Sequence, residues 1–180
     1  SKTTDIAVSA AWALFAGRHK IRGIVAASDK DQARFVRDQI ETVQRLNPWI
    51  GLKTNNYQVV NETTGSDVTI LASDAAGNYG SIPDFLIADE LVHWHKDDNW
   101  QAVYSAVAKR RHCVTTIITN AGLGAGVSWQ WKVREIARTS KDWYFNRIDG
   151  PVAPWISRQR LDEMRRTLTP SGFARLWLNQ

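Results

Sequence analysis

The sequence predicts an α/β fold in which a mostly parallel sheet lies between layers of helices. Three observations predict it. Short apolar strands alternate with longer helical segments, and the strands are apolar on both faces. The chain also has 180 residues, with 43% hydrophobic and 23% charged residues. Strands buried on both faces are typical of parallel sheets covered by helices. A chain of this length folds around its own core without a disulfide or a metal.

The N-terminal third of the chain begins this alternation. Small and apolar residues at helical spacing predict a helix over 4–16, and the apolar run 21–27 predicts a strand. The pair Ser28-Asp29 has the side chains of a helix N-cap, so the next helix is expected to begin there. It is expected to run to about Leu46, because Pro48 stops it.

The remaining elements follow the same alternation. Strands are expected at 57–61, 68–72, 85–88 and 114–119, with a further possible strand at 143–148. Helices are expected at 98–110 and 128–140, followed by a helical tail over 157–179 that is interrupted near Pro170. We therefore divide the chain into an α/β core over 1–150 and a helical tail over 151–180.

Composition excludes several classes of protein. A single cysteine, Cys113, rules out a disulfide framework and fits a reducing compartment. No apolar run reaches the roughly 18 residues of a membrane span. The chain opens Ser-Lys-Thr-Thr-Asp without a signal peptide or a Met, so we expect it to be part of a longer protein. A net charge of +5 and a pI near 9.6 indicate polyanionic partners.

The N-terminus is the first place that could carry chemistry. Lys2 and Thr3 open the first helix. In a phosphate-binding loop, a lysine reaches the terminal phosphates, the next hydroxyl binds magnesium, and the helix N-terminus donates amides. A glycine normally precedes that lysine, and here Ser1 does. The alternative is that Ser1 and Thr4 are ordinary helix caps.

The second place is the apolar run 85–88, which ends in Asp89 and Glu90. Ligands bind at the carboxyl edge of parallel sheets, where this pair is expected to lie. The first acid can hold a hydrated magnesium ion. The second can polarise a water molecule for attack on a phosphate. The alternative is that both acids cap the helix that follows.

The third place is the end of the strand at 114–119, where Thr119 and Asn120 precede Ala121 and Gly122. A hydroxyl or an amide at this point can sense a γ-phosphate. The alternative is a turn in which Asn120 and Gly122 supply the backbone angles.

The order of these pieces adds information that each alone lacks, because Asp89 lies 87 residues after Lys2 and Thr119 lies 30 residues after Asp89. As an ordered set they resemble the ATPase (motor) domain of the large terminase subunit of tailed bacteriophages or prophages. Five segments carry the resemblance: 1–4 as the end of Walker A, 27–33 after the second strand, 80–90 as Walker B with its lead-in, 119–122 as the coupling motif, and 173–180 as the end of the motor domain.

The resemblance implies a P-loop NTPase fold of the ASCE (RecA-like) type, a three-layer sandwich, with ATP and Mg²⁺ as cofactors. Lys2 would contact the β- and γ-phosphates, and Thr3 would bind both the nucleotide and the magnesium ion. Asp89 would hold that ion through water, and Glu90 would be the catalytic residue that orients the attacking water. Thr119 and Asn120 would sense the γ-phosphate and couple its state to movement of a DNA-gripping surface.

The resemblance also implies partners and missing parts. It implies a motor that drives double-stranded DNA into a procapsid in the host cytoplasm, as a homo-oligomeric ring that meets a portal protein and the small terminase subunit. No membrane is involved. The strand that carries the first part of Walker A is missing, and its absence would leave the strand at 114–119 with an unpaired edge. Nuclease activity is expected only in a C-terminal domain that is also missing.

Two other functions remain open at the level of the sequence. Residues 89–93 read Asp-Glu-Leu-Val-His, which has the spacing of the Asp-Glu-x-x-His box of superfamily-two helicases. The alternative is therefore a helicase-like nucleic-acid translocase domain, although such a domain normally has Ser-Ala-Thr at its coupling motif. A third alternative is a non-catalytic α/β interaction domain in which Asp89 and Glu90 are caps.

Overall fold

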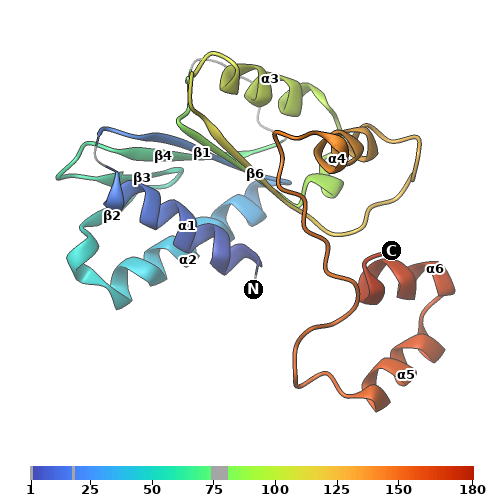
Figure 1. Ribbon diagram of the computed structural model, residues 1–180. Coiled ribbons are helices and arrows are strands. Elements are labelled where there is room, and N and C mark those ends of the chain that lie inside the picture. Colours follow the sequence, from blue (N-terminus) through green and yellow to red (C-terminus); the bar gives the residue numbers. More distant parts are fainter. Residues whose placement is uncertain (1, 18, 74–80) are drawn as a thin grey trace. The chain divides into compact units, whose positions relative to one another are not determined.

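The computed structural model describes residues 2–17, 19–73 and 81–180 (Figure 1). Ser1 and Gly80, which begin the expected Walker A and Walker B segments, lie outside the described residues. The chain divides into two compact units, residues 1–118 and residues 119–180. The first contains the sheet, and the second contains helices and irregular chain.

The first unit is built on a six-stranded sheet in the order β2-β3-β4-β1-β5-β6. The strands are β1 (Arg22–Ala27), β2 (Leu52–Thr54), β3 (Gln58–Asn61), β4 (Asp67–Ala72), β5 (Phe85–Asp89) and β6 (Val114–Ile118). Strands β4, β1, β5 and β6 run parallel, and β2 and β3 are antiparallel to their neighbours. The mostly parallel sheet is thus confirmed. β6 forms one edge of it, as expected, and β2 was not predicted.

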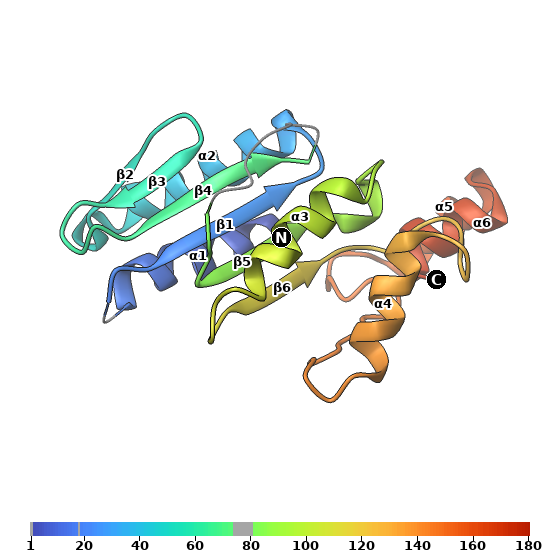
Figure 2. The same ribbon diagram turned by 90° about the horizontal axis from the view of Figure 1, so that it is seen from above.

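Helices cover both faces of this sheet, which confirms the three layers. α1 (Lys2–Ala16) and α2 (Lys30–Leu46) pack against each other on one face, and α3 (Asp98–Val107) lies on the other (Figures 1 and 2). Two short 3₁₀ turns, η1 (Pro48–Ile50) and η2 (Leu91–His93), follow α2 and β5.

Local sequence explains where α2 begins and which face it buries. The Asp29 carboxylate accepts a hydrogen bond from the Gln32 backbone N–H at 2.9 Å, so it satisfies a donor that the first turn leaves unpaired. Ala33, Val36 and Ile40 recur at helical spacing and are fully buried against the sheet and α1. The expected N-cap is therefore confirmed.

The centre of the sheet is tightly packed, and this fixes the position of β5. All five residues of β5 are buried, between β1 on one side and β6 on the other. A Cβ on Gly23 of β1 would lie 2.0 Å from the ring of Phe85, so only glycine fits beneath that ring. The carboxyl end of β5 is thus held by the best-packed part of the unit.

The second unit has little buried surface of its own. It contains α4 (Trp129–Thr139), α5 (Arg158–Thr167), α6 (Pro170–Phe173) and a π-helical turn, η3 (Ala174–Leu178). Each of the three α-helices is capped by a Ser or Thr hydroxyl that accepts a backbone N–H, from Ser128, Ser157 and Thr169. Of its described side chains only Ala137 and Phe173 are buried.

The strand expected at 143–148 does not form, and that prediction was wrong. Tyr144 is 91% exposed, and the Phe145 ring lies beneath the Arg134 guanidinium at 5.6 Å. The aromatic residues here therefore contact α4 or solvent instead of pairing with a strand.

None of the helices in the described part of the chain is long and apolar enough to cross a membrane.

Candidate active site

The acidic pair lies at the carboxyl edge of the parallel strands. Asp89 is the last residue of β5 and pairs in register with Ile118 of β6. The Glu90 backbone N–H continues the ladder by donating to the Ile118 carbonyl at 2.7 Å. This edge is where α/β sheets bind their ligands.

The Asp89 side chain is buried without a partner. It is 1% exposed, and no group among the described residues hydrogen-bonds either of its carboxylate oxygens. Burial, with a further contribution from the charge of Glu90, raises its pKa from 3.8 to about 6, although Lys2 opposes the shift. A buried carboxylate with no donor favours a bound cation, so this residue fits a magnesium ion.

The raised pKa makes ionised Asp89 a destabilising charge in the metal-free protein. Its protonated form favours the folded state fully below pH 3.8, and that contribution is lost as pH rises through about 6. We expect Asp89→Asn to raise the free energy of unfolding by up to about 3 kcal/mol near pH 8, and by less than about 1 kcal/mol near pH 4. Urea unfolding without metal at both pH values measures this. Equal stability of the two proteins near pH 8 would contradict it.

Glu90 turns the chain sharply as it leaves the strand. Its backbone is left-handed, with φ 48° and ψ 50°, a conformation that costs a residue with a side chain about 1 kcal/mol or more. The Lys2 ammonium donates to Glu90 Oε1 at 2.5 Å. The two side chains are 38% and 18% exposed, respectively. The start of α1 and the end of β5 therefore meet in one ion pair.

Trp94 anchors this edge from beneath. Its indole N–H donates to the Asp89 backbone carbonyl at 3.1 Å, and the side chain is 1% exposed. The ring thereby fixes the end of β5 and the turn η2 that follows Glu90. Sequence reasoning missed this residue, because a tryptophan after an acidic pair has many possible uses.

The loop after β1 lies near the same edge. The pKa of Asp29 is lowered, chiefly because its carboxylate accepts the Gln32 N–H, with smaller contributions from the Ser28 hydroxyl and the charge of His93. His93 is exposed in η2, so it is near enough to Asp29 to act on it electrostatically. The histidine of the helicase-like box thus belongs to the rim of the edge.

The other residues of the expected N-terminal motif begin α1. Thr3 is half-buried in the first turn, directly after Lys2. The Thr4 hydroxyl donates to Gln39 Oε1 of α2 at 3.4 Å, so Thr4 contributes to packing between the helices. The structure therefore brings Lys2, Asp89 and Glu90 together, with Thr3 adjoining Lys2.

Thr119 and Asn120 follow β6 in the chain and belong to the second unit. The Thr119 hydroxyl donates to the Asn120 carbonyl at 3.4 Å. The next backbone N–H, of Ala121, donates to the Asn179 side chain at 2.7 Å, and the Asn179 amide donates to the Ile148 carbonyl. Asn179 thus ties the start of the second unit to its end. The sensing role of Thr119 and Asn120 stays a prediction.

Arg110 is engaged elsewhere. It pairs with Asp84 at 2.9 Å and donates to the Ile82 carbonyl, so it holds the chain just before β5. These contacts give Arg110 a structural task.

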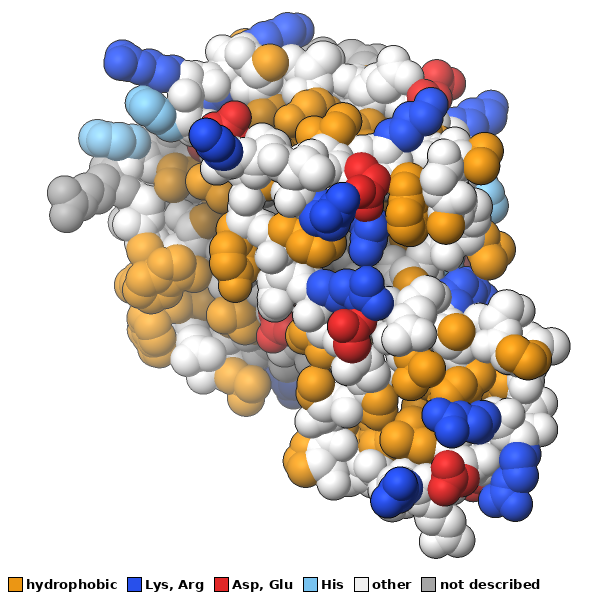
Figure 3. Space-filling model, turned by 45° about the vertical axis from the view of Figure 1, so that its right-hand side comes forward, with side chains coloured by type: hydrophobic (Ala, Val, Ile, Leu, Met, Phe, Trp, Pro, Cys, Tyr) orange, Lys and Arg blue, Asp and Glu red, His pale blue; other side chains and the backbone are white. Residues whose placement is uncertain are grey.

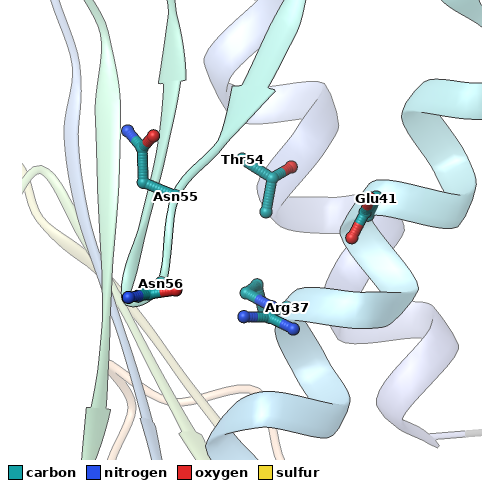
Figure 4. Close-up of a pocket in the computed structure, with 5 residues that line it drawn as sticks. All are labelled: Arg37, Glu41, Thr54, Asn55 and Asn56. Atoms are coloured by element: carbon teal, nitrogen blue, oxygen red, sulfur yellow. The ribbon is translucent and has the colours of Figure 1, made fainter.

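A separate polar hollow of about 420 Å³ lies between α2 and the turn that joins β2 to β3 (Figure 4). It is lined by Arg37, Glu41, Thr54, Asn55 and Asn56. None of the predicted site residues contributes to it, so it is not part of the candidate active site.

The described residues contain no group of three or more His, Cys, Asp and Glu side chains placed to hold a metal ion. Magnesium at a nucleotide site does not need one, since it keeps several waters and takes one or two carboxylates together with phosphate oxygens. The donor set of Asp89 and a helix-borne hydroxyl fits that pattern.

A parallel sheet whose acidic strand end meets a lysine at the start of a helix defines the P-loop class of nucleoside triphosphatases. Within that class, the profile of the family "Terminase large subunit, ATPase domain" matches residues 1–133. The chain belongs to this family, and the match decides against the helicase alternative. No curated protein shows a significant match.

Solved structures of large terminases share the fold. The chain is similar to the HK97 bacteriophage large terminase, with a TM-score of 0.81 and 18% identity, over 99% of this chain and 44% of that one. The Thermus phage P74-26 large terminase ATPase domain gives 0.73 and 19%, over 98% and 82%. The large terminase of a thermophilic bacteriophage in complex with ADP gives 0.71 and 11%, over 99% and 44%. The chain thus spans less than half of two of these proteins.

Proposed function

We propose that this domain hydrolyses ATP with Mg²⁺ to drive double-stranded DNA into a phage procapsid. The observation that carries the proposal is the ion pair between Lys2 and Glu90, formed beside the buried and unpartnered carboxylate of Asp89. Family membership and the ADP complex of a similar terminase support nucleotide as the ligand.

Each site residue has a separate task in this proposal. Asp89 holds the hydrated magnesium ion, because its oxygens have no other donor among the described residues. Thr3 supplies a hydroxyl ligand at the start of α1, where the helix N-terminus also favours phosphate. Lys2 counters the charge of the β- and γ-phosphates, and Glu90 orients the attacking water.

The Lys2–Glu90 ion pair gives the site a resting state. Without nucleotide, Lys2 occupies Oε1 of Glu90, so that oxygen is not available to a water molecule. Phosphate groups offer Lys2 more negative charge than one carboxylate does. Lys2 therefore moves to the phosphates when nucleotide binds, and Glu90 becomes available as the base. Thr119 and Asn120 then transmit the state of the γ-phosphate to the DNA-gripping surface.

The wider proposal concerns partners that act with the whole protein. The working motor is a homo-oligomeric ring in the host cytoplasm that meets the portal protein and the small terminase subunit. DNA cleavage is assigned to a nuclease domain other than this one. Family membership supports these assignments.

Lys2→Ala tests the nucleotide site. Removing one preorganised donor to a reacting group typically costs about 100- to 1,000-fold in rate, and we expect a loss of that size in kcat/KM for ATP in the full-length protein. The matched control is Lys53→Ala, which breaks the exposed Lys53–Glu62 ion pair, 3.1 Å long, in the same unit. The control should hydrolyse ATP normally. Wild-type activity in Lys2→Ala would remove Lys2 from the site.

A further inference from the structure

The positive charge of the protein is confined to one of its two units. Residues 119–180 contain ten Lys and Arg against five Asp and Glu, whereas residues 1–118 contain thirteen of each. The entire net charge of +5 therefore belongs to the second unit. An uneven distribution of this kind is the electrostatic signature of a surface that binds a polyanion.

Some arginines of this unit are already neutralised. Arg134 and Arg138 both pair with Glu135, at 2.5 and 2.8 Å, and Arg147 pairs with Asp149 at 2.5 Å. The pKa of Glu135 is lowered, first of all by its hydrogen bond from Arg138. These arginines have local partners, and they are not the source of the excess charge.

The arginines of α5 differ from them. We call this group the α5 arginines: Arg158, Arg160, Arg165 and Arg166. All of them are exposed, and none forms an ion pair with any of the described residues. α5 also contains Asp162 and Glu163, yet neither acid pairs with them. Figure 3 shows Lys and Arg side chains on the surface at the bottom of the view, the level at which α5 and α6 lie in Figure 1.

The helix that carries these arginines is well defined. The Ser157 hydroxyl accepts the Arg160 backbone N–H and caps α5, and the Arg165 guanidinium lies over the Phe173 ring at 5.2 Å. Arg166 Nε donates to the Asp162 carbonyl one turn earlier, at 3.2 Å. Side chains that are partly fixed before binding lose less conformational entropy when they bind.

We propose that the α5 arginines bind the phosphate backbone of double-stranded DNA. The proposal rests on the proposed function, which supplies the polyanion, and it deepens it by assigning the contact to one helix. Arg guanidinium groups match phosphate geometry, and such contacts position a protein on a duplex without reading its sequence. Binding should therefore be sequence-independent and fall steeply with salt.

The test compares two double variants of the full-length protein that remove the same charge. Arg158→Gln with Arg160→Gln removes two α5 arginines that have no side-chain contact among the described residues. Arg138→Gln with Arg147→Gln removes two arginines that are already paired. Binding of a fluorescent duplex of mixed sequence is measured by anisotropy over a salt series. ATP hydrolysis without DNA is measured alongside.

For duplex DNA, each phosphate contact contributes about 0.9 to the slope of log K against log salt. We expect the α5 double variant to lose about 1.8 from that slope, and the control to keep the wild-type slope. ATP hydrolysis without DNA should be unchanged in both. An unchanged slope in the α5 variant, or an equal loss in both variants, would overturn the proposal. Either result leaves the proposed function standing, because that function is tested separately by Lys2→Ala.

Discussion

Glu90→Gln should bind ATP and fail to hydrolyse it. The amide keeps the size and shape of the side chain but cannot accept a proton from water. Losing a positioned base typically costs about 100- to 10,000-fold in rate, so kcat should fall by that factor. Nucleotide affinity should stay within a few-fold of wild type, because in the proposal Lys2 and Asp89 carry the binding. Single-turnover hydrolysis and equilibrium binding of a labelled nucleotide separate the two effects.

The control for this variant is Glu62→Gln. Glu62 also pairs with a lysine, Lys53, but it lies on the exposed surface, 66% accessible, away from the carboxyl edge. It should hydrolyse ATP at the wild-type rate. Near wild-type hydrolysis by Glu90→Gln would show that Glu90 is not the catalytic base, and the interpretation of the acidic pair as helix caps would then be restored.

The backbone at Glu90 explains why this residue is hard to replace. A left-handed residue with a side chain is strained, and the structure keeps it in place with the ladder bond to Ile118 below and the turn η2 above. The strain aims the carboxylate at Lys2 instead of along the strand direction. Position 90 therefore combines a chemical and a geometric requirement.

Much of this architecture was predictable because local and tertiary preferences agree. The apolar run of β5 fixes a buried central strand, so Asp89 had to lie at the carboxyl edge of the sheet. The N-cap at Asp29 was equally legible, since one short side chain decides it. Asp89 and Glu90 were placed correctly at the sheet edge for these reasons.

The missed features depend on contacts between distant parts of the chain. β2 has only three residues, one of them the exposed Lys53, and it exists because it pairs with β3. The expected strand at 143–148 has strong β-propensity but no strand partner among the described residues. The contact of Trp94 with Asp89 and the missing donors around Asp89 are tertiary properties, which no local pattern encodes.

Asp89→Asn should abolish the dependence of nucleotide binding on magnesium. The substitution removes the charge that holds the ion and leaves a neutral amide, which is a weaker ligand for a hard cation. Wild-type protein should gain about 2.7 kcal/mol of stability from Mg²⁺-nucleotide present at 100 times its Kd, and the variant should gain almost none. Thermal unfolding with nucleotide, with and without EDTA, measures the difference.

This variant gives the site a signature that a purely structural aspartate would not show. Without ligand it should be the more stable protein, because it lacks a buried charge whose pKa is raised to about 6. With Mg²⁺-nucleotide the order should reverse, because only the wild type gains stability from the ion. Asp38→Asn, at an exposed carboxylate paired with Arg37, should change neither quantity appreciably. If Asp89→Asn binds Mg²⁺-nucleotide as tightly as wild type, the ion is held by other residues, and the unpaired oxygens of Asp89 have a different cause.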